Sequence, residues 1–276
     1  MNKTPPTPHR HVLYEAAVQS FDFELDLFTK AWKKNSTRVP LRLREDFCGT
    51  AAMAAHWAAS RPDRLAWGVD LDDATLRWGL ENRIKPLGDA ATRVRLLRQN
   101  VLDPFAEKVD IICALNFSYW IFHDRDTLLR YFKSVRKGLA DDGMFMLDVY
   151  GGPLAMETLE EKKKIPAGKD PTGAPHPAFT YFWQQETFDH LSHRTRCNIH
   201  FQLKGKPRME RAFTYDWRQW TPPELTDLLR EAGLGKIDCW AEGWDSKAGA
   251  PNGRMLPRKK YAGMQAFILY LAARPG

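Results

Sequence analysis

The stretch Leu43-Arg44-Glu45-Asp46-Phe47-Cys48-Gly49-Thr50-Ala51 decides the fold of this 276-residue chain. A short strand ends in acidic residues, a turn of small residues follows, and an Ala-rich helix then begins. This order is typical of a nucleotide-binding loop, because the amide groups at a helix N-terminus and a close approach of the backbone can receive a ligand. The stretch therefore predicts an α/β fold with a ligand at this turn.

The chain around this turn alternates between strands and helices. From Leu41 to Val149 the pattern indicates a parallel sheet covered by helices on both faces. The expected strands are 41–44, 65–69, 94–97, 111–115 and 144–149, and the expected helices are 51–59, 74–87 and 127–139. A capping box at Thr221–Glu224 begins a further helix that Gly233 ends, and two closing strands are expected at 237–240 and 264–272.

Four segments depart from this alternation. Residues 1–37 contain a Pro-rich start and one helical stretch, 11–32. Residues 162–177 and 242–261 are rich in glycine and basic residues, so each is predicted to be a loop. Three runs of aromatic and β-branched residues between 179 and 217 are separated by polar turns. They predict an antiparallel β insert over 151–220.

Composition limits the partners and the compartment. The net charge of +7 permits an anionic partner, but the basic residues are scattered, so we expect a solvated surface rather than a nucleic-acid track. The four cysteines lie far apart without a CxxC pair, which predicts free thiols and no metal site. The polar start 1–6 and the lack of an apolar run long enough to cross a bilayer predict a cytoplasmic protein without membrane contact.

The opening stretch resembles the first motif of class I S-adenosylmethionine (SAM)-dependent methyltransferases, which reads acidic-x-Gly-x-Gly-x-Gly. Glu45 takes the acidic place and Cys48-Gly49-Thr50 the middle of the motif. Phe47 and Ala51 stand where the outer glycines would be. The small-molecule members of the family also share the Thr-Pro-x-Glu-Leu helix that begins at Thr221.

The resemblance implies a fold and an activity. The fold would be a Rossmann-like, seven-stranded, mostly parallel sheet with helices on both faces, formed by 38–150 and 221–276. The antiparallel β insert would follow the fifth strand. The activity would be transfer of a methyl group from SAM to an O or N nucleophile of a small molecule.

The resemblance also assigns cofactor-binding residues. Asp70 takes the place of the acidic residue that binds both ribose hydroxyls, with bonds worth roughly 1.5–3 kcal/mol each. Asn100 takes the place of the residue that holds the adenine amino group. The alternatives are a helix cap for Asp70 and a plain turn residue for Asn100. The other expected cofactor contacts are Tyr14, Glu45, Cys48, Gly49, Thr50, Leu71, Val101 and Asn116.

Catalysis by this route needs few groups. Methyl transfer from a sulfonium requires alignment and exclusion of water, so neither a triad nor a metal is expected. A general base would help if the acceptor is a hydroxyl or an ammonium. The candidates nearest in sequence are Tyr119, His123, Asp148 and Tyr150. His123 is either such a base or a histidine that pins a loop.

Two added segments are expected to complete the site. Tyr14 and the helix around it either cover the cofactor as a lid or form a plain packing helix. In the insert, a regular strand from Met209 would place Arg211, Phe213, Tyr215 and Trp217 on one face. With Arg211 and Tyr215 as contacts, that face would suit a partly apolar or anionic small-molecule acceptor. The same face is alternatively the seam of a homodimer.

Rival functions stay open on the sequence. A nicotinamide-dependent dehydrogenase would need Gly-x-Gly-x-x-Gly, which the turn lacks. A nucleic-acid or protein methyltransferase often has an Asn/Asp-Pro-Pro-aromatic motif after the fourth strand, and residues 116–119 contain no proline. The altered glycine loop also permits a non-catalytic SAM-binding module.

Overall fold

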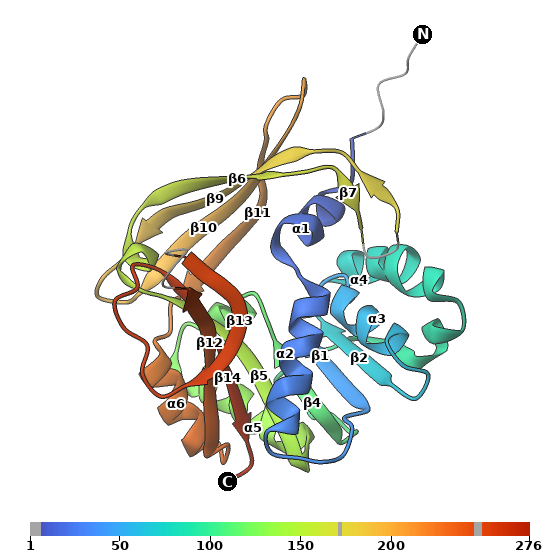
Figure 1. Ribbon diagram of the computed structural model, residues 1–276, viewed down its shortest axis with the longest axis vertical. Coiled ribbons are helices and arrows are strands. Elements are labelled where there is room, and N and C mark those ends of the chain that lie inside the picture. Colours follow the sequence, from blue (N-terminus) through green and yellow to red (C-terminus); the bar gives the residue numbers. More distant parts are fainter. Residues whose placement is uncertain (1–6, 171–172, 246–249) are drawn as a thin grey trace.

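The computed structural model describes residues 7–170, 173–245 and 250–276 (Figure 1). The predicted Pro-rich start, 1–6, lies outside the described residues. Positions 171–172 and 246–249 of the two predicted loops also lie outside them.

An eight-stranded sheet in the order β13-β12-β14-β5-β4-β1-β2-β3 forms the centre of the molecule. Its parallel strands are β1 (Arg42–Asp46), β2 (Leu65–Asp70), β3 (Val94–Arg98), β4 (Val109–Ala114) and β5 (Leu139–Gly151). Three antiparallel strands continue it: β12 (Lys236–Asp245), β13 (Ala250–Arg258) and β14 (Phe267–Arg274). Every residue of β4 is buried, as expected for a strand covered on both faces. The predicted mostly parallel sheet is confirmed.

The expected number of seven strands is wrong by one. The eighth strand is β13, which lies within the segment 242–261 that we predicted to be a loop. β12 runs on to Asp245, and β13 returns antiparallel beside it. The composition conceals this strand because an edge strand is commonly charged and interrupted by glycine and proline.

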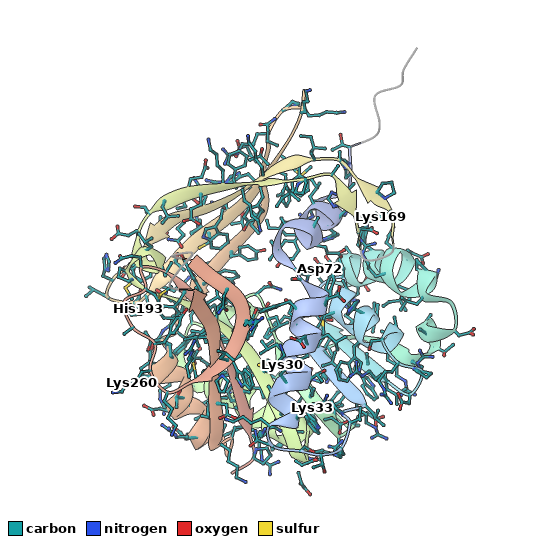
Figure 2. The ribbon with its side chains drawn as sticks, viewed as in Figure 1. Lys30, Lys33, Asp72, Lys169, His193 and Lys260 are labelled. Atoms are coloured by element: carbon teal, nitrogen blue, oxygen red, sulfur yellow. The ribbon has the colours of Figure 1, made fainter. Side chains whose placement is uncertain are left out.

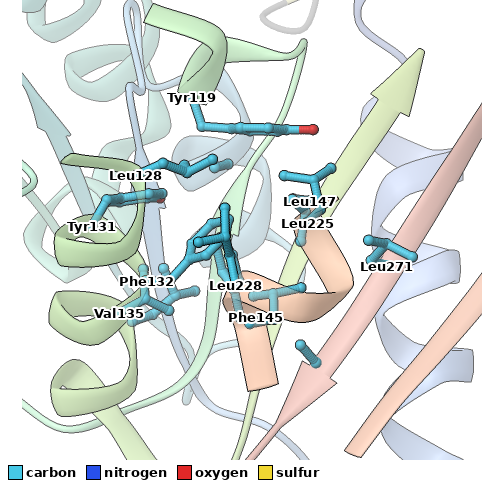
Figure 3. Close-up of a cluster of buried hydrophobic side chains, with 14 of the residues drawn as sticks. Tyr119, Leu128, Tyr131, Phe132, Val135, Phe145, Leu147, Leu225, Leu228 and Leu271 are labelled. Atoms are coloured by element: carbon cyan, nitrogen blue, oxygen red, sulfur yellow. The ribbon is translucent and has the colours of Figure 1, made fainter. Parts of the chain in front are cut away.

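Helices cover both faces of the sheet (Figure 1). One face is covered by α2 (Phe21–Lys33), α3 (Ala52–Ala59) and α4 (Asp73–Gly79), and α4 continues through the helical turns η1 (Leu80–Ile84) and η2 (Lys85–Arg93). The other face is covered by α5 (Arg125–Gly138) and α6 (Pro222–Glu231). Figure 3 shows this second core, where Phe132 of α5, Leu228 of α6 and Phe145 of β5 pack together.

The single helix predicted over 11–32 is in fact two helices. α1 (Arg10–Val18) ends at Gln19, whose backbone is extended, and α2 begins after Ser20. α1 packs on the insert through Leu13, whereas α2 packs on the central sheet through residues such as Phe28 (Figure 1). The apolar residues of 11–32 do not follow one helical period because the two helices pack on different partners.

The insert is a four-stranded antiparallel sheet in the order β11-β10-β9-β6. Its strands are β6 (Leu159–Ile165), β9 (Phe179–Phe188), β10 (Arg194–Leu203) and β11 (Met209–Arg218). The insert predicted after the fifth strand is confirmed, but the loop predicted over 162–177 is wrong. β6 pairs with β9 across most of its lysine-rich length, and a short hairpin, β7 (Gly168–Lys169) with β8 (Pro175–His176), follows it. Two short helical turns, η4 (Pro153–Met156) and η3 (Ser118–Ile121), complete the elements.

The basic side chains are spread over the surface. Lys30 and Lys33 lie on α2, Lys169 lies on β7, and Lys260 lies in the loop after β13; all four are exposed (Figure 2). Among the described residues, no helix is long and apolar enough to span a bilayer.

Candidate active site

The site lies where the carboxyl ends of β1 and β4 meet in the sheet. These strands are neighbours although β2 and β3 separate them in the chain, so the sheet order reverses direction between them. Ligands of open α/β sheets bind in the crevice at such a point. Two cavities open there, one over the loop after β1 and the other below the insert.

The first cavity, of about 320 Å³, we call the loop cavity. Its walls come from α1, the loop after β1, the end of β2, the loop after β4, and β11. Seven of the predicted cofactor-binding residues line it: Tyr14, Glu45, Cys48, Gly49, Thr50, Asp70 and Asn116. The structure thus brings together residues that the sequence separates widely.

The loop after β1 has an unusual backbone. Phe47, Gly49 and Ala51 have φ of 55°, 52° and 56°, so all three positions of the glycine motif are left-handed although only one is glycine. The Asp70 carboxylate holds this loop, because its Oδ2 accepts from the Gly49 amide group at 2.8 Å. The other oxygen, Oδ1, accepts from the Asp72 amide group at 2.9 Å. Asp70 therefore lines the cavity and fixes the turn at once.

Glu45 joins the strand to the helix behind the loop. Ala51 offers no side-chain cap to α3, and the Glu45 carboxylate instead accepts from the Ala54 amide group at 2.9 Å. Burial raises the pKa of Glu45 to about 8, although this hydrogen bond opposes the shift. Cys48 is buried in the same turn, and burial raises the pKa of its thiol well above the ordinary value. The thiol therefore behaves as a packed side chain and not as a nucleophile.

Three predicted cofactor contacts lie outside the lining of this cavity. Leu71 is 60% exposed, and Val101 is buried in the core under α5. The Asn100 side-chain oxygen accepts from the Leu102 amide group at 3.0 Å, which is the geometry of a turn residue. The adenine contacts predicted for Asn100 and Val101 stay predictions.

The second cavity, of about 290 Å³, we call the aromatic cavity. It lies between the insert, α1, α2 and the ends of β5 and β14. Eight aromatic side chains line it: Tyr14, Phe117, Tyr150, Tyr181, Trp183, Tyr215, Trp217 and Tyr270. Three residues, Tyr14, Asn116 and Tyr215, line both cavities. The two cavities therefore meet at these residues.

Asp148, a predicted base, lines the aromatic cavity and holds the loop after β4. Its Oδ2 accepts from the Asn116 amide group at 2.7 Å, and its Oδ1 accepts from the Phe117 amide group at 2.9 Å. Both loop residues have a φ of 57°, a left-handed conformation that costs energy and needs such support. Burial raises the pKa of Asp148 to about 7, while the two hydrogen bonds lower it.

The structure does not bring Tyr119 or His123 to either cavity. Tyr119 is fully buried, and its hydroxyl donates to the Asp148 carbonyl at 2.8 Å. The His123 ring bonds to the Asp216 carbonyl at 2.9 Å, and its own carbonyl accepts from Arg218. These contacts do not support a general-base role for Tyr119 or His123, and they match the alternative in which His123 pins the loop to β11. Tyr150 does line the aromatic cavity.

The prediction that Arg211 shares a face with Tyr215 is wrong. β11 bulges opposite His200, and Arg211 itself has a φ of 48°. The guanidinium consequently turns away and donates to Glu186 at 2.8 Å. Regular alternation resumes only from Phe213, so Tyr215 faces the cavity without Arg211.

Part of the aromatic face packs within the chain. Phe213 packs on Tyr14 of α1 with ring centroids 4.9 Å apart, and Tyr215 and Trp217 line the aromatic cavity. A homodimer stays a prediction.

Sequence reasoning missed two carboxyl groups of the N-terminal helices. Glu24 of α2 is 5% exposed and lines the aromatic cavity. The sequence contains a pattern that marks Glu24 as buried, because Leu27, Phe28 and Ala31 follow it at i+3, i+4 and i+7 on the same helix face. Glu15 of α1 is 2% exposed; it accepts from the Thr50 hydroxyl at 2.6 Å and from Arg83 at 2.7 Å.

Comparison with known proteins supports the fold. No protein-family model and no curated protein matches the sequence. Among solved structures, a SAM-dependent methyltransferase from Clostridium acetobutylicum superposes with a TM-score of 0.68 at 17% identity, over 96% of this chain and 97% of that chain. An amino pentose methyltransferase from Micromonospora echinaspora, involved in calicheamicin biosynthesis, gives 0.67 at 14% identity, over 99% and 100%. A sugar N-methyltransferase from Streptoalloteichus gives 0.63 at 15% identity, over 100% and 96%.

The chain has the fold of SAM-dependent methyltransferases. These structures match over nearly their whole length, so the insert and the N-terminal helices belong to the shared architecture as well as the central sheet. The fold-level resemblance drawn from Glu45 to Ala51 is confirmed.

Proposed function

We propose that the protein is an enzyme that transfers a methyl group from SAM to a small-molecule acceptor. The observation that supports this best is the meeting of the two cavities at Tyr14, Asn116 and Tyr215. A donor in the loop cavity and an acceptor in the aromatic cavity would face each other at this junction. Two proteins of similar structure are described as an amino pentose methyltransferase and a sugar N-methyltransferase. A sugar-sized acceptor fits the aromatic cavity of about 290 Å³.

The residues of the loop cavity fit the cofactor. The Asp70 carboxylate lines the cavity, and each of its oxygens retains a lone pair beyond the one bonded to a loop amide group. It could therefore accept from both ribose hydroxyls. Gly49 has no side chain, and a Cβ there would meet only Thr75 at 3.8 Å, so the backbone is open to a close approach. When bound, SAM would supply an activated methyl group on a sulfonium.

The chain itself would supply alignment and a dry environment. Tyr14 and Tyr215 would confine the reacting groups from above, and the strained loop at Asn116, held by Asp148, would support them from below. Such alignment can contribute roughly 7–11 kcal/mol to lowering a barrier.

A binding experiment tests the cofactor site directly. Calorimetry should show that SAM and S-adenosylhomocysteine bind the wild-type protein. In Asp70→Ala, affinity should fall on the order of ten- to a hundredfold, because two hydroxyls lose a charged acceptor. Asp63→Ala removes an exposed carboxylate from the turn before β2 and should bind like the wild type. Unchanged affinity in a folded Asp70→Ala protein would contradict the proposed site.

A further inference from the structure

The aromatic cavity has an unusual charge for this protein. The chain has a net charge of +7, yet no lysine, arginine or histidine among the residues that the structure describes lines this cavity. The charged side chains that line it are all carboxyl groups, from Glu24, Asp148 and Glu161. A site for an anionic acceptor, as Arg211 suggested in the sequence, would have the opposite character.

Two of these carboxyl groups are deeply buried. Glu24 and Asp148 are each 5% exposed, and Glu161 lies exposed at the edge of the cavity on β6. The Asp148 carboxylate accepts hydrogen bonds from two backbone amide groups. Glu24 forms no ion pair with any residue in the described part of the chain. Burial raises the pKa of Glu24 to about 8, the nearby Asp148 carboxylate raises it further, and the Ser20 backbone lowers it.

Burying a carboxylate without a cation is costly, so such groups normally have a charged partner. The walls of the cavity also favour a cation. Tyr181, Trp183, Tyr215 and Trp217 of the insert present aromatic rings to it, and the faces of such rings attract ammonium groups. A cavity lined by both carboxyl groups and aromatic rings is complementary to a protonated amine.

We propose that the acceptor is an amine that enters as an ammonium ion, and that Glu24 binds its nitrogen and removes its proton. This assignment rests on the methyltransferase function proposed above, and it names the substrate class of that site. Glu161 at the mouth would attract the cation, and Asp148 would keep the loop at the junction in place.

The ammonium nitrogen gives one proton to the Glu24 carboxylate, which leaves a neutral amine with a free electron pair. That pair forms the new N–C bond to the methyl carbon, while the electron pair of the breaking C–S bond stays on sulfur. The methylated ammonium product leaves, and Glu24 returns its proton to water.

Matched pairs of small molecules test the assignment. A panel of primary and secondary amines, each beside the alcohol of the same skeleton (2-phenylethylamine beside 2-phenylethanol, for example), is titrated calorimetrically into the full chain saturated with S-adenosylhomocysteine. We expect at least one amine to bind about tenfold or more tightly than its alcohol. If no amine is preferred, the inference is overturned.

Two variants identify the residue responsible. Glu24→Gln keeps the shape and removes the charge, so the preference for the amine should fall by about tenfold while affinity for S-adenosylhomocysteine stays unchanged. Asp26→Asn removes a carboxylate from the exposed side of the same helix and should keep the preference. A Glu24→Gln protein that is folded by circular dichroism and keeps the full preference would refute the role of Glu24.

The two proposals fail in different ways. If S-adenosylhomocysteine does not bind the wild-type chain, the methyltransferase function is wrong. If it binds but amines and alcohols bind equally, only the amine assignment is wrong.

Discussion

At the scale of residues, the loop after β1 keeps the left-handed backbone of the glycine motif although the two outer glycines are replaced by Phe47 and Ala51. Side chains at a left-handed position cost roughly 1–2 kcal/mol, and both Phe47 and Ala51 occupy such positions. Neighbouring hydrogen bonds hold them there: the Cys48 amide group donates to the Val69 carbonyl at 3.0 Å, and the Ala51 amide group donates to the Cys48 carbonyl at 2.8 Å. The motif is therefore a backbone conformation that the surrounding strands impose, and glycine is one way to reach it.

Three buried carboxyl groups predict how stability depends on pH. The pKa values of Glu24, Glu45 and Asp148 rise from 4.5, 4.5 and 3.8 to about 8, 8 and 7 in the folded protein. The folded state therefore binds these protons more tightly than the unfolded chain does. The stabilisation is complete below about pH 4 and is lost as the pH rises through about 7 to 8.

Urea unfolding of the ligand-free protein at several pH values measures this effect. We expect the urea concentration at the midpoint of unfolding to fall, through the contribution of these groups, as the pH is raised from about 5 to about 8.5. Glu24→Gln should lose less stability over that interval because its amide does not titrate. Asp26→Asn, at an exposed position, should follow the wild type. If the unfolding midpoint of Glu24→Gln depends on pH as steeply as that of the wild type, Glu24 ionises like a free side chain.

At the scale of elements, α4 packs directly on the loop that it helps to position. Gly79 lies so close to this loop that a Cβ there would meet the Thr50 carbonyl oxygen at 2.3 Å and the Thr50 carbonyl carbon at 2.8 Å. Because these are backbone atoms, neither can move without disturbing the cavity.

Gly79→Ala should consequently destabilise the protein by about 1–3 kcal/mol and weaken SAM binding. Gly235→Ala is the matched control, because a Cβ there would meet only Gly276 at an ordinary 3.7 Å. Chemical denaturation and calorimetry on both variants give the two readouts. Equal stability of the two variants would mean that the helix shifts freely away from the loop.

The helix α1 is tied to the loop after β1 by Glu15. The bonds from Thr50 and Arg83 to its carboxylate fix the helix over the loop cavity, which His11 and Tyr14 also line. Burial raises the pKa of Glu15, while Arg83 lowers it, so the ion pair keeps a buried charge partly compensated.

We expect hydrogen exchange across 10–18 to slow when S-adenosylhomocysteine binds, because the ligand would fill the space beneath the helix. Thr50→Val removes one of the two bonds to Glu15 and should raise exchange of α1 in the free protein. The amides of β4, buried in the sheet, serve as the internal reference. No added protection of α1 on binding would mean that it is a plain packing helix.

At the scale of the whole molecule, function depends on segments that are distant in the chain. The aromatic cavity combines α1, α2, the ends of β5 and β14, and the insert. Figure 1 shows the insert lying across the top of the central sheet with α1 beneath it. Neither the sheet nor the insert alone encloses this space, so the cavity exists only through their packing.

The sequence by itself determined those features that local contacts decide. The strand–turn–helix at Glu45 to Ala51, the alternating pattern up to Val149 and the capping box at Thr221 each depend on residues near one another in the chain. These patterns predicted the sheet and the insert. The family resemblance, carried by the same local stretches, assigned Asp70 and Thr50 to one cofactor site, and both residues line the loop cavity.

Only the tertiary structure decided the rest, because it depends on contacts between remote segments. The bulge that turns Arg211 outward arises from pairing with β10, and β13 exists as a strand only beside β12. Glu24 becomes a site residue because α2 packs its apolar face on the sheet and carries the carboxyl group into the aromatic cavity with Asp148. A pattern within one helix can mark Glu24 as buried, but which cavity it enters and which charges surround it are fixed only when the chain folds.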